Sequence, residues 1–199
     1  ALVAIRPSTG EIVAAANSPG TNGLPLATTG QAAPGSTFKI VTALALLRAG
    51  LTPDSLVSCT ETVTVDGRVF KNYDDYPASG LGEIPLRTAL ANSCNTAFIS
   101  QRDLVSQADL ADAAAALGVG VAYDTGYSGF VGSVPREATK TEHAASMIGQ
   151  GKVTASALSM AIVMATVVHG STLLPRLVER PSVPTAAKSD TPQASSPTT

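Results

Sequence analysis

Residues 34–50 read PGSTFKIVTALALLRAG, a proline-glycine break followed by an almost wholly apolar run that ends at another glycine. The pattern predicts a helix over residues 37–47 with apolar side chains on every face, which is typical of a helix buried on all sides. Ser36 and Lys39 are three residues apart, so their side chains share the first turn, where a hydroxyl and an amine can share a hydrogen bond. Alone, the pair favours a serine N-cap and a lysine that reaches solvent, and a chemical interpretation needs further residues.

The composition predicts one globular core and excludes several classes of protein. The 199 residues are 44% hydrophobic and 14% charged, with a formal net charge of -2, and this weakly acidic balance argues against a nucleic-acid surface. The longest apolar run, Ala161 to Val168, is far shorter than the roughly 20 residues of a membrane-spanning helix. We find no metal or nucleotide motif and expect no cofactor, and we expect His143 and His169 to be structural.

The rest of the chain alternates short strands and helices. Strands are expected over residues 2–5, 11–16, 62–65, 68–70 and 173–178, and helices over residues 86–92, 95–105, 109–117 and 157–168. Residues 17–33 and 118–140 lack a period and are expected to be loops, the second with a short strand. Thr154 or Ser156 can cap the last helix. Residues 181–199 are almost entirely Pro, Ser, Thr and Ala, which predicts a disordered or loosely extended tail.

Two further stretches place polar residues or glycines beside apolar helices. Residues 93–95 read SCN, and alone they favour a turn in which Ser93 and Asn95 cap neighbouring helices. Residues 149–151 read GQG ahead of the helix expected from residue 157, and alone they indicate only a packed turn.

Taken together and in this order, three stretches resemble the penicillin-binding protein transpeptidase family of serine acyl transferases. They are PGSTFK at residues 34–39, SCNTAF at residues 93–98, and GQG at residues 149–151 with VT at 153–154 and LSMA at 158–161. Among subgroups, the chain looks most like the class B, transpeptidase-only enzymes of actinobacteria. The resemblance implies an α/β, β-lactamase/transpeptidase-like fold, with an antiparallel sheet from the terminal portions and a helical lobe between them. Residues 1–180 would form a partial transpeptidase domain whose C-terminal sheet strands are missing, followed by the tail or linker at 181–199.

The resemblance also implies a D,D-transpeptidase that cross-links peptidoglycan, and it assigns roles to four residues. A serine hydroxyl needs a base, and a lysine amine one helical turn away can serve when burial disfavours its ammonium form. Ser36 would form an acyl-enzyme with D-Ala-D-Ala stem peptides or with β-lactams, and Lys39 would be its base. Ser93 would relay a proton to the leaving group, while Asn95 would bind the substrate amide and help to hold Lys39.

The implied setting is outside the cytoplasm, on a membrane anchor absent from this chain. Cell-division or elongation proteins are the expected partners, and nucleic acid is not. The competing hypothesis is a non-catalytic penicillin-recognising sensor or scaffold domain that binds peptidoglycan or a partner without turnover.

The third motif of the family, lysine-threonine-glycine, is absent from the sequence. The nearest string, KTE at residues 140–142, precedes the GQG stretch and has a glutamate where the motif needs glycine, so we reject it. We expect the chain to stop before this motif, and its start at Ala1 without a methionine also suggests a piece of a longer protein. The activity of the chain by itself is therefore in question.

Cys59 and Cys94 are the only cysteines. The extracytoplasmic setting implied by the resemblance permits one disulfide, which would brace Ser93 and Asn95. Two buried free thiols are the alternative, and the sequence does not choose between them.

Overall fold

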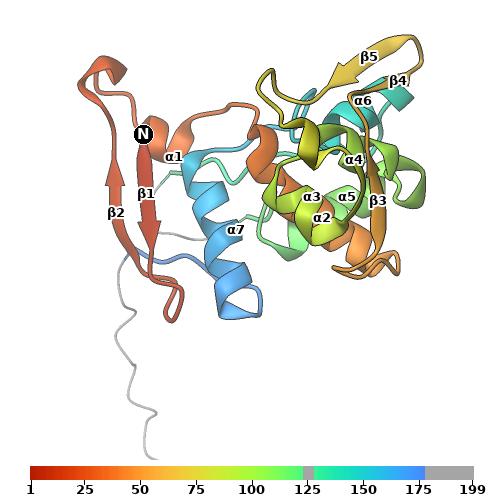
Figure 1. The fold of residues 1–199 in the computed structure, drawn as a ribbon. Helices are drawn as coiled ribbons and strands as arrows, with labels where there is room; N and C mark the ends of the chain where they lie inside the picture. Colours follow the sequence, from red (N-terminus) through yellow and green to blue (C-terminus); the bar gives the residue numbers. More distant parts are fainter. Residues whose placement is uncertain (123–127, 178–199) are drawn as a thin grey trace, which may run out of the picture.

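The computed structural model describes residues 1–122 and 128–177, in which a two-stranded hairpin lies beside a helical lobe (Figure 1). The helices are α1 (Leu26–Thr29), α2 (Lys39–Arg48), α3 (Leu86–Ala91), α4 (Asn95–Ser100), α5 (Gln107–Ala116), α6 (Lys140–Ser146) and α7 (Ala157–His169). The strands are β1 (Leu2–Ile5), β2 (Ile12–Ala16), β3 (Leu56–Cys59), β4 (Thr62–Val65), β5 (Arg68–Lys71) and β6 (Gly82–Pro85). Short 3₁₀ turns are η1 (Pro19–Thr21), η2 (Gly35–Phe38), η3 (Ala78–Gly80) and η4 (Arg102–Leu104). The predicted mixed α/β architecture with antiparallel pairing is confirmed.

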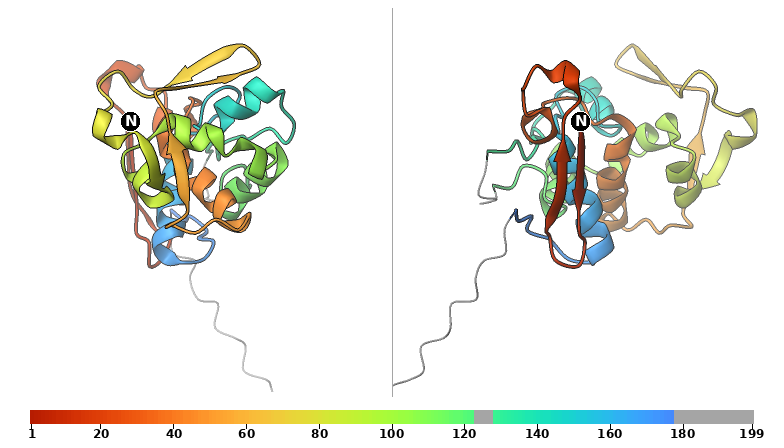
Figure 2. Two further views of the ribbon diagram at one scale, coloured as in Figure 1. Left: turned by 45° about the vertical axis from the view of Figure 1, so that its right-hand side comes forward. Right: turned by 90° about the vertical axis from the view of Figure 1, so that its left-hand side faces the viewer.

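The N-terminal hairpin of β1 and β2 packs on helix α7. The strands are antiparallel, and their register shifts between Ala4 and Ile5. Ile12 forms a small buried cluster with Leu158 and Ile162 of α7, which lies directly behind the hairpin in the right-hand view of Figure 2. The predicted capping of this helix by Ser156 is confirmed, because its hydroxyl accepts a hydrogen bond from the Ser159 N–H.

The helical lobe surrounds α2 and contains the main core. Phe38, Val41 and Leu46 are fully buried and pack with side chains from the neighbouring helices, among them Phe98 and Leu110. Burial of this much apolar surface fixes α2 in the lobe, with its first turn facing the 93–95 segment. The helix is not buried on every side as predicted, since Leu47 is 40% exposed.

Two small antiparallel sheets, β3 with β6 and β4 with β5, flank the lobe. The β4–β5 hairpin turns at Asp66 and Gly67, both with positive φ, which is the geometry of the two-residue turns that favour an Asp-Gly pair. This hairpin was predicted, and it extends along the edge of the lobe (Figure 1), with Val65 and Phe70 buried in the core. Strands β3 and β6 were not predicted, because they pair across more than 20 residues of chain and no short turn joins them.

Several expected boundaries were wrong. Helix α4 ends at Ser100 and is followed by the 3₁₀ turn η4, so no single helix covers residues 95–105. Helix α5 starts earlier than expected because Ser106 and Asp109 form a capping box at its N-terminus. The expected loop at residues 17–33 contains η1 and α1. Helix α6 was not expected. None of the described helices is long and apolar enough to span a bilayer.

The C-terminal expectations were partly wrong. Instead of a strand at residues 173–178, the described part of the chain shows a single parallel bridge of Arg176 to Glu11, and Pro175 beside it has no N–H to donate to a ladder. In the described part of residues 118–140, the short strand that was expected there is reduced to an isolated bridge between Ser133 and Thr154. Residue 178 and the tail predicted at 181–199 lie outside the described residues.

Candidate active site

Residues 34–39, here called the nucleophile turn, place Ser36 at the surface directly above a buried lysine. Gly35 has a φ of 56°, and its N–H donates to the Gly149 carbonyl at 2.8 Å. A side chain at Gly149 would overlap the Gly35 carbonyl oxygen, so the close approach requires glycine there. The turn is a 3₁₀ segment, and the α-helix predicted from residue 37 starts at Lys39. The GQG stretch therefore packs against the nucleophile turn and accepts its Gly35 N–H.

Lys39 contacts the other three predicted site residues. Its side chain is fully buried, and its Nζ lies 3.0 Å from the Ser36 Oγ, 2.9 Å from the Ser93 Oγ and 2.6 Å from the Asn95 Oδ1. The Ser93 backbone carbonyl is a fourth partner at 2.8 Å. The structure therefore brings together Ser36, Lys39, Ser93 and Asn95 around one amine, although the two turns are more than 50 residues apart.

The types of these four partners restrict where the protons of the amine can go. The Ser93 carbonyl and the Asn95 Oδ1 can only accept hydrogen bonds, so they take two N–H groups. A neutral amine has two N–H groups and one lone pair, which leaves the lone pair facing the hydroxyls of Ser36 and Ser93. In the neutral form, the amine is thus oriented to accept a proton from either serine.

Burial makes this neutral form accessible near neutral pH. Removal from water disfavours the ammonium and lowers the pKa of Lys39 from its ordinary 10.5 to about 8. The ring of Phe98, whose centroid lies 5.9 Å from Nζ, forms part of the apolar surroundings. With this pKa, about one-tenth of the amine is neutral at pH 7 and about half at pH 8, so the form that can take a proton from a serine is populated near neutral pH.

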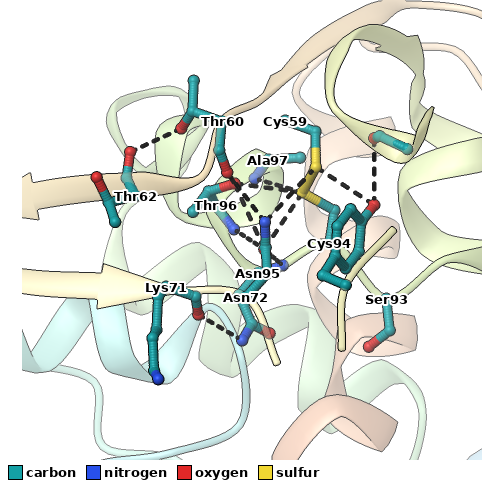
Figure 3. The surroundings of a disulfide bond; sticks show 12 residues. Cys59, Thr60, Thr62, Lys71, Asn72, Ser93, Cys94, Asn95, Thr96 and Ala97 are labelled. Carbon is teal, nitrogen blue, oxygen red and sulfur yellow. Dashed lines mark hydrogen bonds between the residues drawn. A yellow bond between two sulfur atoms is a disulfide. The ribbon is translucent and has the colours of Figure 1, made fainter. Parts of the chain in front are cut away.

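Residues 93–95, here called the second-motif turn, are held by contacts from outside their own helices. Ser93 adopts a φ of 56°, an uncommon left-handed conformation for a residue with a side chain. Cys94 is bonded to Cys59 at the end of β3, so the disulfide is present and the alternative of two free thiols is wrong (Figure 3). The bridge joins the end of β3 to the turn that presents Ser93 and Asn95, a pairing that the sequence had left open.

Asn95 is contacted by Lys71, the last residue of β5, and by Asn72, which follows it. The Asn95 Nδ2 donates to the Lys71 carbonyl at 2.9 Å, and the Asn95 N–H donates to the Asn72 Oδ1 at 2.8 Å (Figure 3). The amide group is thereby oriented with its oxygen toward Lys39. Sequence reasoning missed both residues, because no local pattern connects the end of a hairpin to a turn more than 20 positions later.

The rejected string at residues 140–142 and His143 have structural contacts outside the four-residue cluster around Lys39. Lys140 to Glu142 form the first turn of α6, where Thr139 and Glu142 make a capping box, so this string is helical. Glu142 also pairs with Lys152 at 2.7 Å, and its carboxylate accepts a hydrogen bond from the Thr139 N–H. Together these two contacts lower the pKa of the carboxyl group to about 2. His143 lies within hydrogen-bond distance of Gln107 and of two backbone carbonyls, a set of partners that supports the expected structural role.

Comparison with known proteins gives concordant results. The chain matches the family described as penicillin binding protein transpeptidase domain over residues 1–197. It is 34% identical over 158 residues to the peptidoglycan D,D-transpeptidase PbpA of Mycobacterium tuberculosis, covering 73% of this chain and 30% of that protein. It therefore spans less than a third of the length of this curated relative.

Solved structures agree on the fold. The penicillin G acyl-enzyme complex of penicillin-binding protein A from M. tuberculosis superposes with a TM-score of 0.74 at 28% identity, covering 84% of this chain and 45% of that chain. PBP2 of Pseudomonas aeruginosa, at 24% identity, shares the fold with a TM-score of 0.74, covering 88% of this chain and 48% of that chain. The chain belongs to the penicillin-binding protein transpeptidase domain family.

Proposed function

We propose that this chain forms the part of a peptidoglycan D,D-transpeptidase that carries the nucleophile and its base. The observation that carries the proposal is the buried Lys39 amine, whose two obligatory acceptors leave its lone pair facing the hydroxyls of Ser36 and Ser93. A lysine retained only for packing or solubility would have no reason to be buried against two serines and an amide oxygen.

Each residue then has a chemical task. Lys39 takes the proton of Ser36 as its Oγ forms a bond to the carbonyl carbon of the penultimate D-alanine. The bond from that carbon to the nitrogen of the terminal D-alanine breaks, and the proton passes from Lys39 through the Ser93 hydroxyl to the leaving amine. Asn95 holds Lys39 through Oδ1 and hydrogen-bonds the amide of the substrate. An acceptor amine of a second stem peptide then attacks the acyl carbon, the bond from that carbon to the Ser36 Oγ breaks, and the proton that the amine loses passes through Lys39 to Oγ.

The oxyanion of the tetrahedral intermediate needs preorganised N–H donors. The Ser36 backbone N–H at the start of the turn would supply one donor. The second would come from the strand that carries the lysine-threonine-glycine motif, which this sequence does not contain. Tests of activity therefore require the full-length protein that includes this chain.

The relatives support the assignment of substrate and inhibitor class. Penicillin-binding protein A of M. tuberculosis has been captured as acyl-enzymes with penicillin G, imipenem and ceftriaxone. A β-lactam acylates the same serine that attacks the stem peptide, so this chain would bind both. Peptidoglycan lies outside the cytoplasm, so the protein would act there, with cell-division or elongation proteins as possible neighbours.

The proposal is tested by labelling the full-length protein with a fluorescent penicillin. We expect one covalent adduct, and we expect Ser36→Ala to abolish it. Ser18→Ala, which removes an exposed serine far along the chain from the site, should label like the unchanged protein. Absence of an adduct in the unchanged protein would leave the non-catalytic scaffold as the better hypothesis. An adduct that survives Ser36→Ala would refute the assignment of the nucleophile.

A further inference from the structure

Helix α4, which begins at Asn95, lacks an ordinary cap at its start. The residue at the N-cap position is Cys94, which is committed to the disulfide with Cys59. Its sulfur accepts from one backbone donor of this turn, the Ala97 N–H at 3.3 Å, and it also lies 3.3 Å from the Thr96 hydroxyl. Sulfur is a weak acceptor compared with the oxygen of Ser, Thr, Asp or Asn. The N–H groups of Asn95 and Thr96 must therefore find partners elsewhere.

Asn72 supplies the missing cap from a distant part of the chain. Its Oδ1 accepts from the Asn95 N–H at 2.8 Å and from the Thr96 N–H at 3.2 Å. Its Nδ2 donates to the Thr60 carbonyl at 2.9 Å, so both ends of the amide are satisfied. Asn72 is only 6% exposed, and a buried amide with this many partners is fixed in position (Figure 3).

The same segment also sets the orientation of the Asn95 side chain. Lys71, the neighbour of Asn72, uses its backbone carbonyl to accept from the Asn95 Nδ2. With its backbone held by Asn72 and its amide nitrogen held by Lys71, Asn95 can only direct its Oδ1 toward the Lys39 Nζ, at 2.6 Å. A movement of the 71–72 segment would therefore change the position of the acceptor that orients the catalytic amine.

We propose that Asn72 is a positioning residue for acylation: it acts through Asn95 to orient the Lys39 amine toward Ser36. This inference rests on the proposed function, because it concerns the rate at which Ser36 is acylated. Loss of the Asn72 contacts would slow acylation by displacing the amine, since displacement of a reacting group by about 1 Å can slow a reaction by about 100-fold.

The test measures penicillin acylation of the full-length protein in two separate quantities. One is the first-order acylation rate constant at saturating penicillin, and the other is the fraction of protein that becomes labelled. Loss of folded protein lowers the labelled fraction but leaves the rate constant of the folded molecules unchanged. Misplacement of the amine lowers the rate constant.

Three variants separate these effects. We expect Asn72→Ala to lower the rate constant by about 10- to 100-fold. Asn72→Asp keeps an oxygen that accepts from both N–H groups but loses the donor to Thr60, so we expect it to retain a rate constant within about threefold of the unchanged protein despite lower thermal stability. Val69→Ala removes an exposed side chain from the strand that precedes Asn72, so it should not change the rate.

Thr96→Val is the matched control within the same network. Its hydroxyl donates to the Thr60 carbonyl at 2.7 Å, and the substitution removes this buried bond while it keeps the backbone N–H that Asn72 caps. We expect reduced stability with an unchanged rate constant. An unchanged rate constant in Asn72→Ala, or equal losses in Asn72→Ala and Thr96→Val, would overturn the inference. If the unchanged protein forms no adduct at Ser36, the proposed function itself fails, which is a separate result.

Discussion

The nucleophile turn and the second-motif turn meet at the same amine, but they are fastened to the fold in different ways. The nucleophile turn runs directly into α2, whose apolar side chains anchor it in the core of the lobe. The second-motif turn lies between two six-residue helices and is tied by the Asn72 amide and by a disulfide, from positions 23 and 35 residues away. Local sequence thus builds one half of the site, and long-range contacts build the other.

Removal of the group that joins the two turns should have the largest effect. We expect Lys39→Ala to slow acylation of the full-length protein by at least about 100-fold, since Ser36 then has no adjacent base. The measurement is the acylation rate constant with fluorescent penicillin. Lys39→Met, which fills the same buried space without an amine, should be equally slow. Labelling at the rate of the unchanged protein in either variant would remove Lys39 from the mechanism.

The second-motif turn should be the one that depends on the disulfide. Replacing Cys59 and Cys94 together by alanine releases a loop closed over 35 residues, and we expect a loss of about 2 to 4 kcal/mol in the free energy of unfolding. Chemical denaturation before and after reduction measures the same effect in the unchanged protein.

A separate measurement tests whether the Cys59–Cys94 disulfide is present in solution. Alkylation of the denatured, unreduced protein followed by mass measurement should modify no cysteine. Two modified thiols would refute the disulfide, and stability that does not depend on reduction would show that the second-motif turn is held without it.

The nucleophile turn should be sensitive to the glycine behind it. Gly149 has a φ of 67°, and an added Cβ would meet the Gly35 carbonyl and the Phe38 side chain. Gly149→Ala therefore combines left-handed strain with overpacking, each of which costs about 1 to 3 kcal/mol.

Gly170→Ala provides the matched control for this prediction. Gly170 has a similar φ of 82° but open space around its Cα, so its substitution should cost only the strain of about 1 to 2 kcal/mol. Unfolding by denaturant measures both variants. Equal losses in the two would mean that Gly149 does not pack against the nucleophile turn as described.

The pH dependence is the smallest expected effect, and it reports on the contact between the two turns. With a pKa of about 8, Lys39 is about one-tenth neutral at pH 7 and about nine-tenths neutral at pH 9. The acylation rate constant should therefore rise about tenfold between these values and level off above pH 8. A rate that is flat from pH 7 to 9 would contradict the lowered pKa.

Stability should change with pH in a way that has the same origin. The unfolded chain keeps the Lys39 proton up to about pH 10.5, whereas the folded chain releases it near pH 8. Since the unfolded state binds more protons in this window, the free energy of unfolding should rise as the pH increases from about 8 toward 10. Denaturant unfolding at several pH values tests this rise, which Lys39→Met should abolish.

The sequence by itself determined the helix that follows the nucleophile turn and the two hairpins, because each depends on neighbours within a few positions. The turn itself also requires the distant Gly149, whose carbonyl accepts from the Gly35 N–H. Pro34, Gly35 and the apolar run set the helix, and the Asp66-Gly67 turn sets the β4–β5 hairpin. The resemblance in motif order added Ser93 and Asn95 to the set. These contributions came from short-range pattern and from the order of motifs along the chain.

Only the tertiary structure decided which groups hold the second-motif turn and how the lysine is oriented. Three contacts join positions at least 23 residues apart. They are the disulfide, the hydrogen bond from the Asn95 N–H to Asn72, and the hydrogen bond from the Asn95 side chain to the Lys71 carbonyl. Residue patterns carry periodicity and local turn chemistry, but they do not record which distant backbone groups are left without partners. Packing of the lobe brings those groups together, and their need for hydrogen bonds in a buried setting then fixes the contacts that complete the site.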